Sequence, residues 1–219
     1  MSDQVLKLNI MVDKKMHADT QTPMHAGAFD INDDSKIEII EECFFKIMHT
    51  LGLNLEDDSL KKTPRRVAKM FVKEVFSGLN PSNKPDVKLF ENKYMYNEML
   101  VEKNITLYSY CEHHFVPIIG KVHVAYISEG EVIGLSKINR LVQFYAKRPQ
   151  VQERLTKQIA DGLMEALKTE NVAVIIEADH LCVASRGIND TNSSTVTSCF
   201  YGKFKKKSVR SEFKSSIVQ

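Results

Sequence analysis

Residues 99–127 read MLVEKNITLYSYCEHHFVPIIGKVHVAYI, and the rest of the chain is organised around this stretch. Apolar and polar side chains alternate from Met99 to Leu107 and again over Lys121–Ile127, which is typical of half-buried β-strands. Between them, Cys111–Phe115 reads Cys-Glu-His-His-Phe and breaks the alternation. We therefore predict two antiparallel strands joined by a loop that carries a cysteine and two histidines.

Cys111 and His114 are spaced as half of a zinc site, because a tight turn can bring a thiolate and an imidazole nitrogen onto one metal. The chain has four cysteines, Cys43, Cys111, Cys182 and Cys199. Cys182 follows an apolar run, in the sequence His-Leu-Cys. We predict that Cys111, His114 and Cys182 bind one metal and leave the fourth position open, as in catalytic zinc sites. His113 and His180 would then lie beside the metal without binding it.

The spacing by itself leaves a second interpretation open. Free cysteines are often small apolar core residues, so Cys111 and Cys182 could be buried thiols without a metal. His113 and His114 could equally be hydrogen-bonded histidines at the end of a strand. Since neighbouring side chains tend to point in different directions, one of these histidines can bind a metal while the other faces a substrate.

The composition is that of a globular protein, and its net charge says little about partners. The 219 residues are 43% hydrophobic and 26% charged, with a formal net charge of +2. No apolar run approaches the roughly 18 residues that a membrane-spanning helix needs, and the N-terminal stretch lacks the features of a signal peptide. We therefore expect a reduced, cytoplasmic location, with no membrane or nucleic-acid partner. The basic run Lys203–Lys207 is expected to be a solvated strand end.

The N-terminal part divides into an arm and a helical segment. Residues 1–34 show no sustained period and contain six aspartates, so we predict a mobile or variable arm. The remainder, 35–219, is predicted to be a single domain whose helical part covers 35–80. Ser35 and Glu38 have the spacing of a capping box, which marks the start of a first helix.

A second helix is predicted to end at Gly78. Thr63 would cap it, and Pro64 suits the first helical position. Arg66 and Lys69 lie on its N-terminal turns. From composition alone, these cations are interpreted as a solvated basic face.

Two further helices follow the strand pair. Ser136 is a good N-cap, and Lys137 and Arg140 near that helix start would form an anion site, because free N–H groups and the helix dipole both favour a negative ligand. Pro149 is predicted to start the next helix. Glu153 in its first turn either complements the helix dipole or binds a base or amine.

The C-terminal part returns to strand patterns. The apolar run Val172–Ile176 and the Ser- and Thr-rich stretch Thr195–Phe204 predict two more strands. The predicted order is therefore helix, helix, two strands, helix, helix, two strands. This order predicts an α+β fold in which an antiparallel sheet carries helices on one face.

Four motifs occur in this order along the chain. They are Cys-Glu-His-His-Phe over 111–115, Gly-Leu-Ser-Lys-Ile-Asn-Arg over 134–140, Arg-Pro-Gln-Val-Gln-Glu-Arg over 148–154 and His-Leu-Cys over 180–182. In this combination the chain resembles GTP cyclohydrolase I, from about residue 37 to residue 213. The resemblance implies the tunnelling fold, or T-fold, with an N-terminal helical hairpin and a core over 87–213. It also implies a toroidal homodecamer of two stacked pentamers, in which the subunit sheets join into a barrel.

The resemblance further implies an enzyme that converts GTP and water into 7,8-dihydroneopterin triphosphate and formate, the first step towards folate or tetrahydrobiopterin. It implies one zinc ion per subunit on Cys111, His114 and Cys182, with a zinc-activated water that attacks C8 of the guanine. His113 resembles the general acid at N7, and His180 resembles a second acid–base group.

The remaining site residues also come from the resemblance. Ser136 is implied in the rearrangement that closes the pterin ring, and Glu153 grips the guanine edge with Gln152 beside it. Five cations are implied to bind the triphosphate through charge-assisted hydrogen bonds: Arg66, Lys69, Lys137, Arg140 and Arg186.

Two other functions were weighed against this one. The nitrile reductase of queuosine synthesis is another T-fold enzyme, but it uses a cysteine nucleophile and lacks the zinc set seen here. A nucleotide-binding or regulatory protein with a structural zinc would need neither His113 nor His180. Metal content together with a GTP assay discriminates all three.

Overall fold

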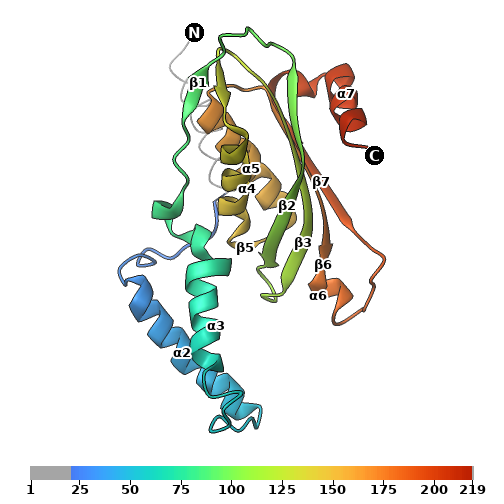
Figure 1. The fold of residues 1–219 in the computed structure, drawn as a ribbon. Helices are drawn as coiled ribbons and strands as arrows, with labels where there is room; N and C mark the ends of the chain where they lie inside the picture. Colours follow the sequence, from blue (N-terminus) through green and yellow to red (C-terminus); the bar gives the residue numbers. More distant parts are fainter. Residues whose placement is uncertain (1–20, 219) are drawn as a thin grey trace, which may run out of the picture.

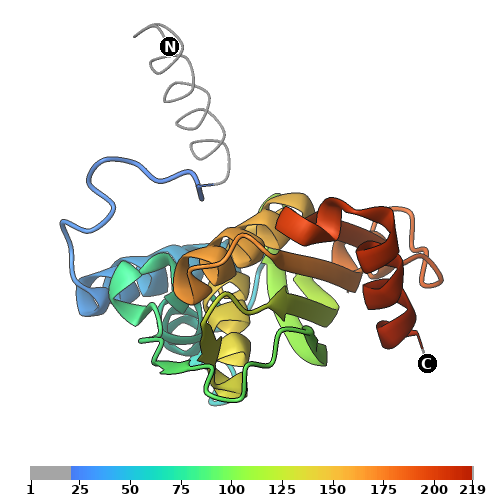
Figure 2. The same ribbon diagram turned by 90° about the horizontal axis from the view of Figure 1, so that it is seen from above.

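The computed structural model describes residues 21–218, so the first twenty residues of the predicted arm lie outside the described part of the chain. Figure 1 shows a twisted β-sheet, two long helices packed against one of its faces, and a helical hairpin that projects from one end. A C-terminal helix lies on the other side of the sheet, as the view from above shows (Figure 2).

The projecting hairpin consists of α2 (Asp33–Thr50) and α3 (Thr63–Lys69), and α3 continues as a π-helix over Met70–Val75. Short 3₁₀ turns at Ser77–Leu79 and Pro81–Asn83 follow. The hairpin is fastened to the domain where the Gly78 N–H donates to the Lys147 carbonyl at 2.9 Å. Both predicted hairpin helices are therefore present, and they lead into the rest of the domain.

The predicted caps of these helices were wrong by one to three residues. Asn32 caps α2, and its Oδ1 accepts a hydrogen bond of 2.9 Å from the N–H of Ser35, which is therefore the donor and not the cap. Lys62 occupies the cap position of α3. Thr63 is the first residue of the helix, and its N–H donates to the Leu60 carbonyl of the preceding turn at 2.8 Å.

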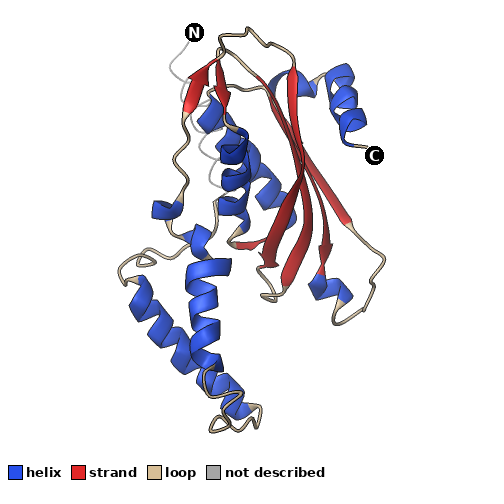
Figure 3. Ribbon diagram, viewed as in Figure 1, coloured by secondary structure: helices blue, strands red, loops and turns tan. Residues whose placement is uncertain are grey.

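The main sheet has five strands in the order β5-β2-β3-β6-β7 (Figure 3). The strands within residues 21–218 are β1 (Leu89–Glu91), β2 (Met99–Cys111), β3 (Pro117–Ile127), β4 (Glu131–Ile133), β5 (Pro149–Gln150), β6 (Val172–His180) and β7 (Thr195–Phe200). Strands β2, β3, β6 and β7 are antiparallel neighbours, as predicted, whereas β5 pairs with β2 in parallel. A separate ribbon of β1 and β4 was not anticipated from the sequence.

Helices α4 (Leu135–Ala146) and α5 (Gln152–Leu167) cover one face of the sheet. Their apolar stripes pack on alternate strand residues, including Val122, Val124 and Val174. This is the main core of the protein, and it arises because strand side chains alternate between the two faces.

The starts of these two helices differ from the prediction. Gly134 is the N-cap of α4, so Ser136 lies in the first turn and does not cap it. Pro149 does not start α5, because Pro149 and Gln150 are extended and pair with Tyr110 and Cys111 of β2. This short strand brings the start of α5 next to the Cys111 loop.

The opposite sheet face carries α7 (Lys207–Ile217), so the prediction of helices on one face only was wrong. Ile127 and Ile175 point to this face and form a second core with Phe204 and Phe213. The basic run is therefore not a strand end. It spans a 3₁₀ turn (Gly202–Lys205) and the start of α7, where two phenylalanines hold the segment down.

Among the helices within residues 21–218, none combines the length and the apolar character that a membrane span would require.

Candidate metal and active site

The loop between β2 and β3 is a tight turn with a defined backbone. The Cys111 carbonyl accepts from the Phe115 N–H at 2.8 Å, and Phe115 has a left-handed φ of 53°. Strand β3 pairs with β6 so that Ile118 lies opposite His180. The short helix α6 (Leu181–Ala184) starts directly after His180. The register of β3 and β6 therefore carries Cys182 to the Cys111 loop.

The three predicted ligands converge in the structure. One ligand atom each of Cys111, His114 and Cys182 lies within 4.8 Å of the others. Cys111 Sγ is 3.7 Å from His114 Nδ1, close to the ~3.6 Å expected between sulfur and nitrogen ligands of one tetrahedral zinc. Two thiols and an imidazole are a donor set that zinc prefers, so the residues fit a zinc ion.

The Cys182 thiol is a weaker acid than an ordinary cysteine. Burial raises its pKa, and the neighbouring Cys111 thiol adds to the effect. A cation between the two sulfurs would reverse this, because it stabilises the thiolate forms.

His113 lies beside the three candidate ligands and is open to the solvent. Its Nδ1 is 3.8 Å from Cys111 Sγ, and its side chain is 64% exposed. Such a side chain can reach an incoming substrate, and the three candidate metal ligands do not include it.

His180 is held by a buried glutamine. Its Nε2 lies 2.7 Å from Gln152 Oε1. The Gln152 Nε2 donates to the carbonyls of Ile176 and Thr195 and to the Thr197 hydroxyl. Because carbonyl oxygens only accept, the amide orientation is determined, and His180 must carry a proton on Nε2. Burial lowers the pKa of His180, although Glu153 and Asp179 act against this shift.

Glu153 and Arg186 are both at the same end of the sheet. Glu153 is exposed in the first turn of α5 and is close enough to His180 to raise its pKa electrostatically. Arg186 is exposed after α6, and its charge partly opposes the rise in the pKa of the Cys182 thiol that burial causes. The structure thus gathers an acidic and a basic side chain around the metal cluster.

The site residues predicted on α4, Ser136, Lys137 and Arg140, precede the end of this helix that contacts β2. Ser109, two residues before Cys111, donates to the carbonyl of Ala146 at the C-terminal end of α4. Ser136 is ten residues earlier on that helix, which corresponds to about 15 Å along its axis. Lys137 follows it and donates to the carbonyl of Asp86 at 2.8 Å. The start of α4, which carries Ser136 and Lys137, is therefore the end of this helix away from β5, and Arg140 lies in the middle of the helix.

Arg66 and Lys69 are exposed on α3. The hairpin that carries them reaches the metal loop through aromatic contacts, since Phe115 packs against Phe71 and Phe76 with ring centroids 6.1 and 5.0 Å apart. These cations belong to an element that contacts the metal loop.

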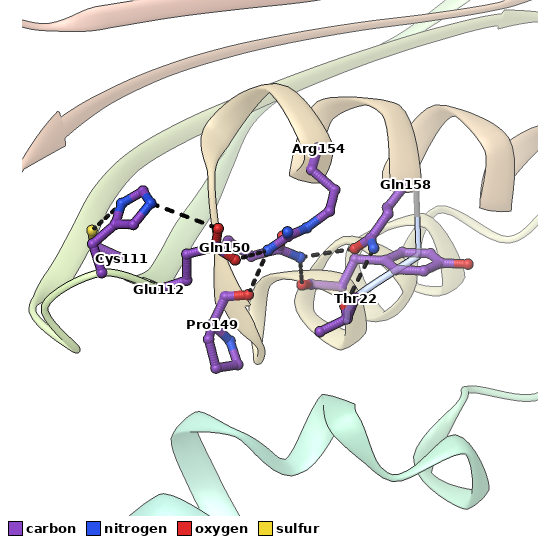
Figure 4. A network of polar contacts seen from close by, with 9 residues as sticks. Thr22, Cys111, Glu112, Pro149, Gln150, Arg154 and Gln158 are labelled. Atoms are coloured by element: carbon purple, nitrogen blue, oxygen red, sulfur yellow. Dashed lines mark hydrogen bonds and ion pairs between the residues drawn. The ribbon is translucent and has the colours of Figure 1, made fainter. Parts of the chain in front are cut away.

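A polar network behind the metal loop had no counterpart in the sequence analysis. Arg154 extends from α5 to Glu112 in the loop and to Gln150 in β5 (Figure 4). Glu112 and Arg154 both lie inside motifs noted from the sequence, which was the available signal. Their spatial pairing across 42 residues was not predictable from local patterns.

Fold and site together define an α+β protein with a Cys-His-Cys metal-type site, flanked by two histidines, at the end of an antiparallel sheet. A family model described as GTP cyclohydrolase I matches residues 40–218. The chain is 60% identical over 201 residues to GTP cyclohydrolase 1 of Flavobacterium johnsoniae, covering 92% of this chain and 90% of that protein. It is 53% identical over 185 residues to GTP cyclohydrolase 1 of Buchnera aphidicola, with coverages of 84% and 85%. The chain belongs to the GTP cyclohydrolase I family, which implies the T-fold.

Proposed function

We propose that this protein converts GTP and water into 7,8-dihydroneopterin triphosphate and formate, and that it does so with one zinc ion per chain. The observation that carries the proposal is the convergence of Cys111, His114 and Cys182 with two further histidines beside them. A site that served structure alone would require neither His113 nor His180. A bound zinc would supply Lewis-acid activation of the water that adds to C8 of the guanine.

The two histidines divide the proton transfers between them. His113 is exposed and delivers a proton to N7 of the guanine, which makes C8 a better electrophile. His180 holds one proton on Nε2 towards Gln152, so its Nδ1 is the nitrogen free to exchange protons during ring opening. We assign Gln152 to this positioning of His180, because its side-chain amide is buried and already bonded.

The substrate is held at its two ends. Glu153 binds the guanine edge, where a carboxylate can accept from the ring N–H and the exocyclic amine. Arg66, Lys69, Lys137, Arg140 and Arg186 bind the triphosphate. The start of α4 is suited to this role because free N–H groups at a helix start favour phosphate. Ser136 at the same helix start takes part in closing the pterin ring.

A homo-oligomer completes the site. In one chain Ser136 and Lys137 lie at the end of α4 away from β5, which pairs with Cys111, so we propose that a second copy supplies one of the two halves. The sheet supports such an assembly, because β7 is an edge strand and β5 covers only two residues of β2. Open edges of this kind pair with other chains. We propose two stacked pentamers whose sheets join into a barrel.

The test separates the chemical steps by assaying formate and the oxidised, fluorescent pterin independently. His113→Ser should keep zinc and GTP binding but lose about 10²–10⁴ in the rate of formate release, since a positioned general acid is gone. His180→Ser should still allow reversible attack at C8 and stall at ring opening or formate release. His25→Ser, at an exposed histidine that is not among the predicted site residues, is the control. Near-normal formate release by His113→Ser would refute the division of roles.

A further inference from the structure

We propose that Arg154 and Glu112 form a positioning pair that holds the His113 side chain in its working orientation. The inference rests on the function proposed above and adds two residues to it. Neither residue is a metal ligand in the cluster, and neither is assigned to the substrate. Figure 4 shows Arg154 directed from the first turn of α5 towards Glu112, with Gln150 beside it.

The Arg154 end of the pair is rigid. The side chain is only 11% exposed. Its Nε donates to Gln150 Oε1 at 3.1 Å, and its Nη2 donates to the Pro149 carbonyl at 3.0 Å and ion-pairs with Glu112. Gln150 is fully buried, and its own amide donates to the Tyr145 carbonyl. A planar guanidinium that serves three acceptors at once has little freedom to move.

The Glu112 end carries this rigidity to the metal loop. The Glu112 N–H donates to the Gln150 carbonyl at 3.0 Å, so its backbone is fixed to β5 while its side chain is fixed to Arg154 of α5. The second carboxylate oxygen, Oε1, lies 3.8 Å from His113 Nε2. His113 Nδ1 faces Cys111 Sγ. The ring is thus placed between one carboxylate and one sulfur, although most of the side chain is exposed.

The positive charge of Arg154 also compensates negative charge in the metal loop. Metal binding would make Cys111 and Cys182 thiolates, and Glu112 adds another negative group in the same loop. An arginine is always protonated, so Arg154 compensates this carboxylate at every working pH. Without the arginine, Glu112 would turn away towards solvent, and His113 would lose its neighbour on that side.

A double-mutant cycle tests whether the two residues act as a unit. Arg154→Met and Glu112→Gln should each lower kcat about 10- to 100-fold, as is typical when a supporting partner is lost, with KM for GTP within about three-fold. The double variant should lose no more than either single variant, because both remove the same support. All variants should retain one zinc per chain. Lys84→Met, which breaks the exposed pair with Glu165, is the matched control.

A second readout does not depend on turnover. Diethyl pyrocarbonate modification of His113, followed by peptide mass spectrometry, should be several-fold faster in Glu112→Gln and Arg154→Met than in the parent. The two readouts separate the two proposals. A parent protein that makes no pterin would refute the proposed function, whereas the modification rates of His113 would still test the Arg154–Glu112 pair. Where Arg154→Met does not fold, Arg154→Lys keeps the stem and the charge and replaces it in both experiments.

Several results would overturn the proposal. Multiplicative losses in the cycle would show that the residues act separately. A raised KM with unchanged kcat would make Arg154 a substrate ligand. Loss of zinc from the variants would mean that the pair supports the metal ligands, and an unchanged modification rate of His113 would show that the ring is held by something else.

Discussion

Cys182 illustrates how a single side chain acquires its chemistry from its surroundings. Burial and the adjacent Cys111 thiol raise its pKa, so protons compete with a metal for this position. Thiolates bind zinc only when deprotonated, and metal affinity therefore falls as the pH is lowered. Cys182 is one of the two thiols among the three candidate ligands, so its loss removes half of the sulfur donors.

Cys182→Ser should lose both the zinc and the activity, because a hydroxyl is a poor substitute for a thiolate ligand. Metal analysis of the purified variant measures this directly, and Cys43→Ser, at an exposed position on α2, is the control that should retain one zinc per chain. A Cys182→Ser protein with a full complement of zinc would disprove the ligand assignment.

Glu153→Gln should reduce the discrimination of GTP from ATP. The loss of one charge-assisted pair with the guanine edge typically costs about 2–3 kcal/mol, or roughly 30- to 150-fold in relative kcat/KM. The measurement is a comparison of kcat/KM for the two nucleotides in parent and variant. Glu165→Gln, on the exposed side of the same helix, should discriminate like the parent. Unchanged discrimination in Glu153→Gln would leave Glu153 as an ordinary helix-start carboxylate.

At the scale of elements, the pairing of β2 with β3 contains an irregularity that a histidine stabilises. The register shifts between Glu102 and Ile105, and Asn104 in the bulge has a left-handed φ of 60°. The Asn104 N–H donates to Nδ1 of the buried His123 at 3.3 Å. This bond requires a neutral imidazole, because Nδ1 must accept.

The stability of this strand pair should therefore depend on pH. Burial lowers the pKa of His123; Lys121 and Lys103 act in the same direction and Glu177 opposes them. The unfolded chain then binds a proton more readily than the folded one. The stabilisation is present above the unfolded pKa of about 6.5, and it is lost as the pH falls through the lower folded pKa.

His123→Asn keeps an acceptor for the Asn104 N–H but cannot be protonated. Urea denaturation between pH 7 and pH 5 should show a shallower fall in the free energy of unfolding for this variant than for the parent. The difference is at most about 1.4 kcal/mol per pH unit, the value for one proton. Parallel curves for the two proteins would mean that His123 does not titrate in this range.

At the scale of the whole molecule, the candidate site is divided. The three candidate ligands, both histidines and Glu153 lie at one end of the sheet, whereas Ser136 lies about 15 Å along α4 from Ala146, the end of that helix bonded to β2 through Ser109. We propose that the α4 group (Ser136, Lys137 and Arg140) and the candidate ligands that meet at one GTP come from two copies of the chain. Association between copies would then be a condition of the proposed activity.

Complementation between two inactive variants tests this condition. Cys182→Ser lacks a metal ligand, and Lys137→Ala lacks a cation of the α4 group. Each should be inactive alone, whereas co-expressed chains should regain part of the parent activity, because some sites combine an intact metal cluster with an intact α4 start. Activity in the mixture that never exceeds the sum of the separate proteins would place the whole site within one chain.

Local sequence patterns were sufficient to predict several elements of this protein and its candidate metal loop. Alternation predicted β2 and β3, and the Cys111–Phe115 motif marked the loop between them, because strand periodicity and turn chemistry are properties of neighbouring residues. The few cysteines of the chain indicated Cys182 as the distant ligand, and the order of the motifs indicated the family. The structure confirms the predicted α+β class and the antiparallel pairing of β2, β3, β6 and β7.

Tertiary structure decided what depends on register and packing. The pairing of β3 with β6 brings Cys182 to Cys111, and the parallel pairing of β5 with β2 places Arg154 against Glu112. The second sheet face is apolar, and α7 packs on it through Phe213, on the side where no helix was expected. Local periodicity contains no information on which distant segments meet, since many pairings bury similar apolar area, and only the folded chain selects among them.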